Sequence, residues 1–122
     1  MPLTIDVTET GAAKGAATTF ALGGSLDNST APQLEKALAP ALGGATTVLI
    51  FDLAKLDFIS SAGLRVFMAA RKRITERQGK LLMKNLRPHV QKVFDIVKSL
   101  PGVQIFGSVK ELDEYLAAIQ KG

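Results

Sequence analysis

The feature that most constrains the fold is a largely apolar run over residues 46–53, Thr-Thr-Val-Leu-Ile-Phe-Asp-Leu, bounded by turn signals. Such a run is typical of a strand that lies inside a parallel sheet and is buried on both faces. Strands that follow it in the same sheet are reached by right-handed crossover connections. The run therefore predicts an α/β domain with this strand at its centre.

Strands and helices alternate after this central strand. Gly79 and Pro101-Gly102 end two of the helices, and Ser108 with Glu111 forms a capping box before the last one. The expected elements are a loop over Ala54–Ser60, a helix over Ser61–Arg77, a strand over Lys80–Asn85, a helix that opens at Pro88, a strand over Val103–Phe106 and a helix through Leu112, Leu116 and Ile119.

A hairpin is expected before the central strand. Thr4–Thr8 alternates apolar and polar residues, which predicts a half-buried strand. Gly11–Gly15 is a turn-rich connector, and Ala17–Leu22 is a second strand that Gly23-Gly24 stops. The antiparallel hairpin makes the expected sheet mixed.

A helix is expected between the hairpin and the central strand. Thr30 and Gln33 have the spacing of a capping box, and Pro32 lies in the first turn. Pro40 should kink the helix or end it just before, with Gly43-Gly44 as the latest stop. The apolar positions with helical spacing are Leu34, Ala37, Leu38, Ala41 and Leu42.

Length and composition limit the function classes. The 122 residues suit one domain over 1–122, with no run of ~18 apolar residues for a membrane span and no signal peptide at the start, so we expect a cytoplasmic protein. The chain has no Cys and a single His, His89, which excludes disulfides, thiolate catalysis and His-rich or Cys-ligated metal sites. We expect no metal and no cofactor.

Two adjacent hydroxyls mark the junction between the loop after the central strand and the next helix. Ser60 and Ser61 lie within Asp57–Arg65, where either can cap the helix and where free amides suit a phosphate. A G-x-S-x-G elbow is absent because Ile59 stands two residues before Ser61, and no phosphate-binding glycine loop is present. With His89 interpreted as a surface or capping residue, the sequence favours a protein that is not an enzyme.

Positive charge is concentrated in the second half of the chain. Residues 65–98 hold ten Lys and Arg against two acidic residues, whereas residues 1–45 hold two Lys against four acidic residues. Nucleic acid or anionic lipid could bind such a surface, but the chain has no Trp and one Tyr and lacks an RNA-binding aromatic pattern. A solvated face or an acidic protein partner is therefore the favoured interpretation, with no direct nucleic-acid binding.

The chain resembles the STAS domain of bacterial anti-sigma factor antagonists over nearly its whole length. Two segments carry this resemblance. They are Ile50–Val66, with its Phe-Ile-Ser-Ser-Ala-Gly-Leu-Arg core, and Gly24–Pro32 before it. Many family members have Asp before the modified Ser and Ser or Thr after it, and Ser60 and Ala62 stand there in this chain. The resemblance implies a single STAS-like α/β domain that is switched by phosphorylation of Ser61, with Ser60 as the alternative.

The family also implies the partners. A serine kinase that doubles as an anti-sigma factor modifies the antagonist, a PP2C-type phosphatase reverses this, and the unmodified antagonist binds the kinase and frees the sigma factor. The alternative is a constitutive STAS scaffold subunit of a lipid-transport or stressosome-like complex, in which Ser61 only caps a helix. The residues expected to contact the partner are Asp27, Asn28, Ser29, Thr30, Ser60, Ser61, Ala62, Gly63, Leu64 and Arg65.

Overall fold

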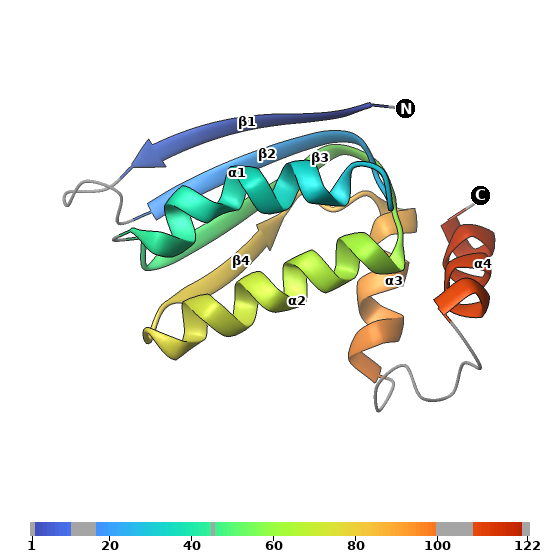
Figure 1. Ribbon diagram of the computed structural model, residues 1–122. Helices are drawn as coiled ribbons and strands as arrows, with labels where there is room; N and C mark the ends of the chain where they lie inside the picture. Colours follow the sequence, from blue (N-terminus) through green and yellow to red (C-terminus); the bar gives the residue numbers. More distant parts are fainter. Residues whose placement is uncertain (1, 11–16, 45, 100–108, 121–122) are drawn as a thin grey trace.

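The protein's structure is a computed structural model that describes residues 2–10, 17–44, 46–99 and 109–120 (Figure 1). The predicted connector at 11–15, strand at 103–106, helix stop at 101–102 and capping residue Ser108 fall outside these residues. The elements in chain order are β1 (Leu3–Thr10), β2 (Ala17–Leu26), α1 (Ala31–Gly43), β3 (Val48–Ile59), α2 (Ser61–Glu76), β4 (Lys80–Lys84), α3 (Pro88–Ser99) and α4 (Val109–Gln120). Their predicted order is confirmed.

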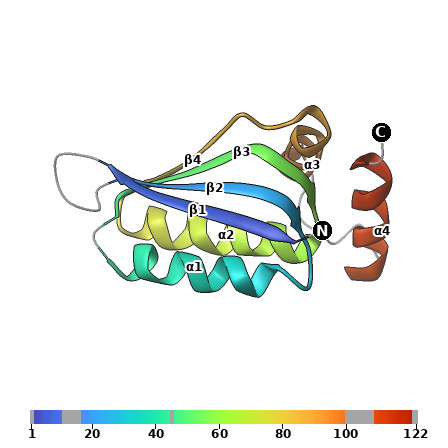
Figure 2. The same ribbon diagram turned by 90° about the horizontal axis from the view of Figure 1, so that it is seen from above.

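The described strands form one mixed sheet in the order β1-β2-β3-β4. β1 pairs antiparallel with β2, whereas β2 with β3 and β3 with β4 are parallel, so the predicted hairpin and mixed sheet are confirmed. Figure 2 shows α1 and α2 side by side on one face of the sheet and α3 and α4 at one end of it. This end holds the carboxyl ends of β2 and β3, where α2 begins.

The core lies between the sheet and the helix pair. Phe51 of β3 is at its centre, with its ring centroid 5.9 Å from that of Phe20 in β2 and 4.6 Å from that of Phe67 in α2. Residues of the other face of β3, such as Ile50, are only half-buried. The expectation that the central strand is buried on both faces is therefore wrong, because α1 and α2 cover only one of them.

Two strands are longer than predicted. β2 continues through Gly23-Gly24 to Leu26, and β3 continues through the segment that was expected to be a loop. Gly24 has φ +87°, and a Cβ there would lie 2.0 Å from the carbonyl oxygen of Pro2, so glycine allows β1 to stay beside β2. Extra residues in β3 opposite β2 interrupt the alternation of apolar and polar positions, which hid the strand in the sequence.

The end of α1 is held by Arg77, the residue that follows α2. The helix continues past Pro40 to Gly43, so the later of the two predicted ends is observed. The guanidinium of Arg77 donates hydrogen bonds to the carbonyl oxygens of Leu42, Gly44 and Thr46, at 2.8 Å for Gly44 and 3.1 Å for Thr46. Part of the positive charge of α2 therefore satisfies carbonyls at a helix end rather than facing a partner.

Candidate functional site at the start of α2

Ser60 is the residue that caps α2. Its backbone is extended, and its Oγ accepts a hydrogen bond from the amide of Gly63 at 3.4 Å. Its own amide donates to the carbonyl oxygen of Leu26 at 2.9 Å, which ties the helix start to the end of β2. Of the two serines that could cap the helix, the structure therefore assigns this role to Ser60.

Ser61 is the first residue of α2, and its hydroxyl bonds none of the described residues. The residue is 6% exposed, and its Oγ is the one buried side-chain oxygen or nitrogen without a hydrogen-bond partner among the described residues. Its backbone amide donates to Oδ1 of Asp113 in α4 at 2.8 Å. Buried hydroxyls are nearly always hydrogen-bonded, so this one is available for a further hydrogen bond or for modification.

The loop between β2 and α1 lies against this helix start and is organised by Asp27. Its Oδ1 accepts hydrogen bonds from the amide and hydroxyl of Ser29, at 3.0 and 2.8 Å, and from the amide of Thr30 at 3.2 Å. The bond from the Ser29 hydroxyl is the main cause that lowers the pKa of Asp27, and the two amides add to it. Asp27 is therefore a charged residue that holds the loop in one shape.

The predicted capping box of α1 is wrong. Thr30 does precede the helix, but its backbone is already helical (φ −105°, ψ −17°) and its side chain makes no capping bond. Instead its Oγ1 accepts from the amide of Asp27 at 2.8 Å and donates to the carbonyl oxygen of Ser25 at 2.9 Å. Gln33 donates to the carbonyl oxygen of Leu3 in β1 at 3.0 Å, so tertiary contacts use both members of the sequence motif.

The two segments that contain the predicted site residues, 24–32 and 50–66, come together around two hollows. The first, of about 750 Å³, is lined by residues 27–29, by Phe58 and Ser60, and by Asp113, Glu114 and Ala117 of α4. The second, of about 360 Å³, is a groove between α1 and α2 whose lining includes Asn28, Ala62, Arg65 and Arg73.

The expected contact residues divide into exposed and buried groups. Asn28, Ser29 and Arg65 are exposed, and Asp27 and Ala62 are half-buried. Thr30, Ser60, Ser61, Gly63 and Leu64 are buried. A Cβ on Gly63 would lie 2.7 Å from Cγ of Leu26, so this glycine allows α2 to start close to the end of β2.

Two residues of α4 complete the site and were missed in the sequence. Asp113 holds the amide of Ser61, as described above. Gln120, which is 9% exposed, accepts from the amide of Ile59 at 2.9 Å and donates to its carbonyl oxygen at 2.7 Å. Gln120 could have been found as a polar residue four positions after Leu116 on an apolar helix face. No sequence pattern distinguishes Asp113.

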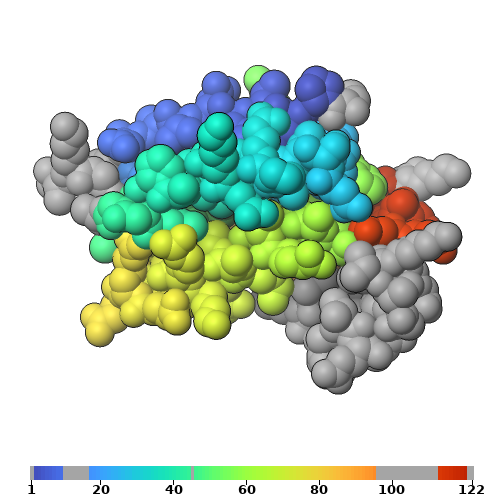
Figure 3. Space-filling view, in the orientation of Figure 1, coloured from blue at the N-terminus to red at the C-terminus, as the bar shows by residue number. Residues whose placement is uncertain are grey.

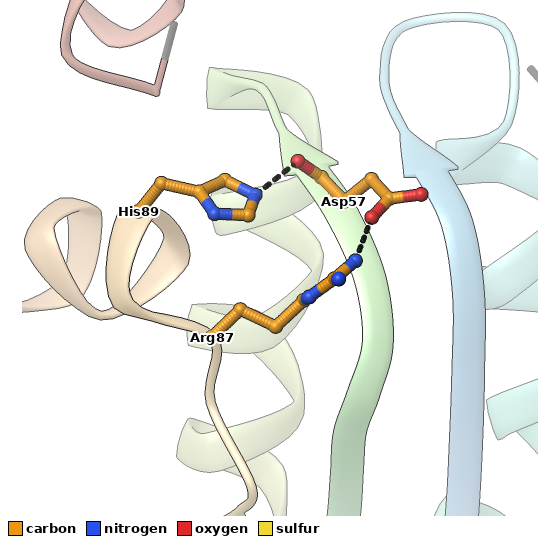
Figure 4. Close-up of polar contacts among 3 residues, drawn as sticks. All are labelled: Asp57, Arg87 and His89. Carbon is orange, nitrogen blue, oxygen red and sulfur yellow. Dashed lines mark hydrogen bonds and ion pairs between the residues drawn. The ribbon is translucent and has the colours of Figure 1, made fainter. Parts of the chain in front are cut away.

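His89 connects α3 to β3, as Figure 4 shows. Its Nε2 lies 2.6 Å from the carbonyl oxygen of Asp57, and the carboxylate of Asp57 forms an ion pair with Arg87. The side chains of Arg87 and Asp57 are 45% and 38% exposed, so this pair stabilises the fold by about 1 kcal/mol or less. The single histidine of the chain thus bonds a backbone carbonyl.

The described residues hold neither a metal-binding cluster nor a membrane-spanning helix. No three His, Cys, Asp or Glu side chains gather there closely enough to hold a metal ion. Within the same residues, no helix is long and apolar enough to cross a membrane.

A comparison with protein-family models matches residues 5–112 to the STAS domain. The chain belongs to the STAS domain family. A putative anti-sigma factor antagonist, BtrV of Bordetella bronchiseptica, is 41% identical over 75 residues, which are 62% of this chain and 65% of BtrV. The anti-sigma-B factor antagonist of Listeria monocytogenes is 33% identical over 73 residues, which are 60% of this chain and 64% of that protein. In these alignments the STAS chain therefore spans just under two thirds of its curated relatives.

Solved structures show the same fold. The anti-sigma factor antagonist SpoIIAA in its unphosphorylated form has a TM-score of 0.70 and 22% identity, and the match covers 78% of this chain and 81% of SpoIIAA. The Bacillus cell fate determinant SpoIIAA in the phosphorylated form has a TM-score of 0.64 and 21% identity, with 76% and 82% covered. The STAS chain is thus a single SpoIIAA-like α/β domain, and its described residues hold a mixed sheet of four strands and four helices.

Proposed function

We propose that the STAS chain is a phosphorylation-switched antagonist of an anti-sigma factor. Its unphosphorylated form binds an anti-sigma factor that is also a serine kinase, and this binding releases a sigma factor. The kinase modifies Ser61, and a PP2C-type phosphatase restores the hydroxyl. The chain itself is not an enzyme, needs no cofactor, acts as one domain over residues 1–122, and works in the cytoplasm. Relatives named anti-sigma factor antagonists support this proposal.

The observation that carries the proposal is the division of roles between the two serines. The Oγ of Ser60 accepts the amide of Gly63, whereas the Oγ of Ser61 has no partner among the described residues. A phosphate on Ser61 would lie at the start of α2, where the positive end of the helix dipole favours an anion. This favours Ser61 over Ser60 as the acceptor.

The switch acts through the surface around the site. The exposed side chains of Asn28, Ser29 and Arg65 surround the helix start and form the partner-facing part of the proposed contact. Phosphorylation adds about −1.5 to −2 charges at pH 7, which a closely packed interface must desolvate. A loss of roughly 3 kcal/mol in binding free energy lowers the affinity by about two decades.

To test the proposal, the protein is incubated with ATP and with each candidate kinase whose gene lies beside its own. We expect a mass gain of one phosphate on a peptide that contains Ser60 and Ser61, lost in Ser61→Ala and kept in Ser60→Ala. Ser61→Asp should bind the kinase more weakly while circular dichroism shows an intact fold. If Ser60→Ala alone abolishes the phosphate, the acceptor is Ser60; if neither variant changes modification or kinase affinity, there is no phospho-switch.

The burial of Ser61 favours a second candidate function. A hydroxyl inside the molecule is out of reach of a kinase in this conformation, which suits a constitutive scaffold subunit of a lipid-transport or stressosome-like complex. A scaffold would copurify stably with such a complex and take no phosphate from any candidate kinase. The kinase assay therefore separates the two functions.

The exposed basic residues of α2 are proposed to guide an acidic protein surface to the site. Arg65 and Arg73 line the groove between α1 and α2, and Arg71 and Lys72 of the same helix are exposed. Salt should therefore slow association with the kinase. Gel-shift titration is the check: DNA binding in the submicromolar range at physiological salt, which falls steeply with added salt, would contradict the assignment.

A further inference from the structure

Helix α4 is held against the candidate site by two polar contacts from distant parts of the sequence. Near its start, Asp113 accepts the amide of Ser61 at 2.8 Å. At its end, Gln120 bonds both the amide and the carbonyl oxygen of Ile59, as a neighbouring strand would. Leu116 between them is fully buried. Figure 3 shows α4, in red, beside the green start of α2.

With α4 docked, the hydroxyl of Ser61 is closed to a kinase. Ser61 is 6% exposed with its Oγ buried, so phosphoryl transfer, which needs the hydroxyl in line with the γ-phosphate, has no approach. The carboxylate of Asp113 also occupies the place at the first amide of α2 where a phosphate would bind. The adjoining hollow is lined by Asp27, Asp113 and Glu114, so a phosphate dianion there would meet three carboxylates.

We propose that α4 is a cover for Ser61, and that Ser61 accepts phosphate only when Asp113 and Gln120 have released the helix. This rests on the proposed function in so far as Ser61 is the acceptor. In the released state the kinase transfers the γ-phosphoryl group of ATP to Oγ, which loses its proton, and ADP leaves. The phosphate then takes the place of Asp113 at the amides of α2.

The coupling works in both directions. If docked α4 disfavours phosphate on Ser61 by some factor, phosphate disfavours docking of α4 by the same factor. The two forms of the protein therefore differ in the position of α4 as well as in charge, because α4 is released in the phosphorylated form. A partner that contacts both the start of α2 and α4 would recognise this difference.

The absence of Cys allows a direct test without a kinase. Ser61→Cys introduces the only thiol of the chain, and its alkylation by iodoacetamide measures how often the position is uncovered. We expect slower alkylation than in Ser29→Cys, whose position is exposed. Adding Asp113→Ala or Gln120→Ala to Ser61→Cys should raise the rate about tenfold, as expected for the loss of one or two hydrogen bonds.

Matched variants separate release of α4 from general unfolding. Glu76→Ala removes an exposed charge at the far end of α2 and should leave the rate unchanged. Ala70→Cys places the thiol in the buried part of α2, where alkylation reports global unfolding. The proposal is refuted if the thiol at position 61 reacts as fast as that at position 29, if neither α4 variant raises its rate, or if the rate at position 70 rises equally.

The kinase assay gives an independent outcome. In the otherwise native chain, Asp113→Ala and Gln120→Ala should speed phosphorylation of Ser61 by the same factor that they speed alkylation. If the alkylation results hold but no kinase modifies Ser61, the cover stands and the proposed phospho-switch fails. If phosphorylation occurs at a rate that neither variant changes, the switch stands and the cover is refuted.

Discussion

The two adjacent serines should respond in opposite directions to replacement by alanine. Ser61→Ala removes a buried hydroxyl that has no partner among the described residues. A buried, unbonded hydroxyl costs about 1–3 kcal/mol, and alanine also has the higher helix propensity, so we expect a gain of about 1 kcal/mol in the free energy of unfolding. Ser60→Ala removes the cap of α2 and leaves the amide of Gly63 without its acceptor. Loss of a cap costs about 0.5–2 kcal/mol, and because the 3.4 Å bond is longer than usual we expect a loss of about 1 kcal/mol.

Urea denaturation at pH 7 measures the free energy of unfolding of each variant. We expect the two values to differ by about 2 kcal/mol, with unchanged m-values. Each change should move the midpoint of thermal unfolding by roughly 3–6 °C, upward for Ser61→Ala and downward for Ser60→Ala. The reasoning fails if Ser61→Ala loses as much stability as Ser60→Ala, because its hydroxyl would then have a stabilising partner. A gain would mean that the protein keeps a destabilising hydroxyl at the site, as functional residues often require.

Three further predictions concern residues around the site and in the core. Thr18→Val should cost about 1–3 kcal/mol because it strands the buried hydroxyl of Thr46, which lies 2.8 Å away, and adding Thr46→Val should restore most of this loss in a double-mutant cycle by urea denaturation. The bond from the Ser29 hydroxyl lowers the pKa of Asp27, so its stabilisation is present above the unfolded value of about 3.9 and is lost as pH falls through the folded value. Asp27→Asn should therefore flatten the fall in stability below about pH 4, and an unchanged slope would refute this role. Gly63→Ala should destabilise by about 1–3 kcal/mol through overpacking against the neighbouring leucine of β2, and an equally stable variant would show that α2 can shift.

The element order could be predicted from sequence because it depends on local patterns. The apolar run at the start of β3 and the spacing of Val90, Val93 and Phe94 in α3 identify elements without tertiary information. The extents of β2 and β3 could not be predicted, because Gly24 acts as a strand residue only where the neighbouring strand approaches its backbone. Extra residues in β3 had the same effect, since each shifts the alternation by which a strand is identified.

The candidate site was predicted only in its local part. Ser60 and Ser61 were found because a helix start after a central strand is visible in the sequence. The choice of Ser60 as the cap depends on backbone angles that two adjacent serines do not reveal. Asp113 lies 52 residues from Ser61, so their contact depends on how α4 packs, which no sequence pattern states.

The sheet follows chain order from β1 to β4, whereas Gln120 contacts Ile59 across 61 residues. The contact between Gln120 and Ile59 can form only after residue 120 has been made, whereas the contacts among β1, β2 and β3 need only residues up to 59. During synthesis the amino-terminal part can therefore fold while α4 is still being made. For that interval α4 cannot cover Ser61, so we expect the nascent chain to be the form most open to modification.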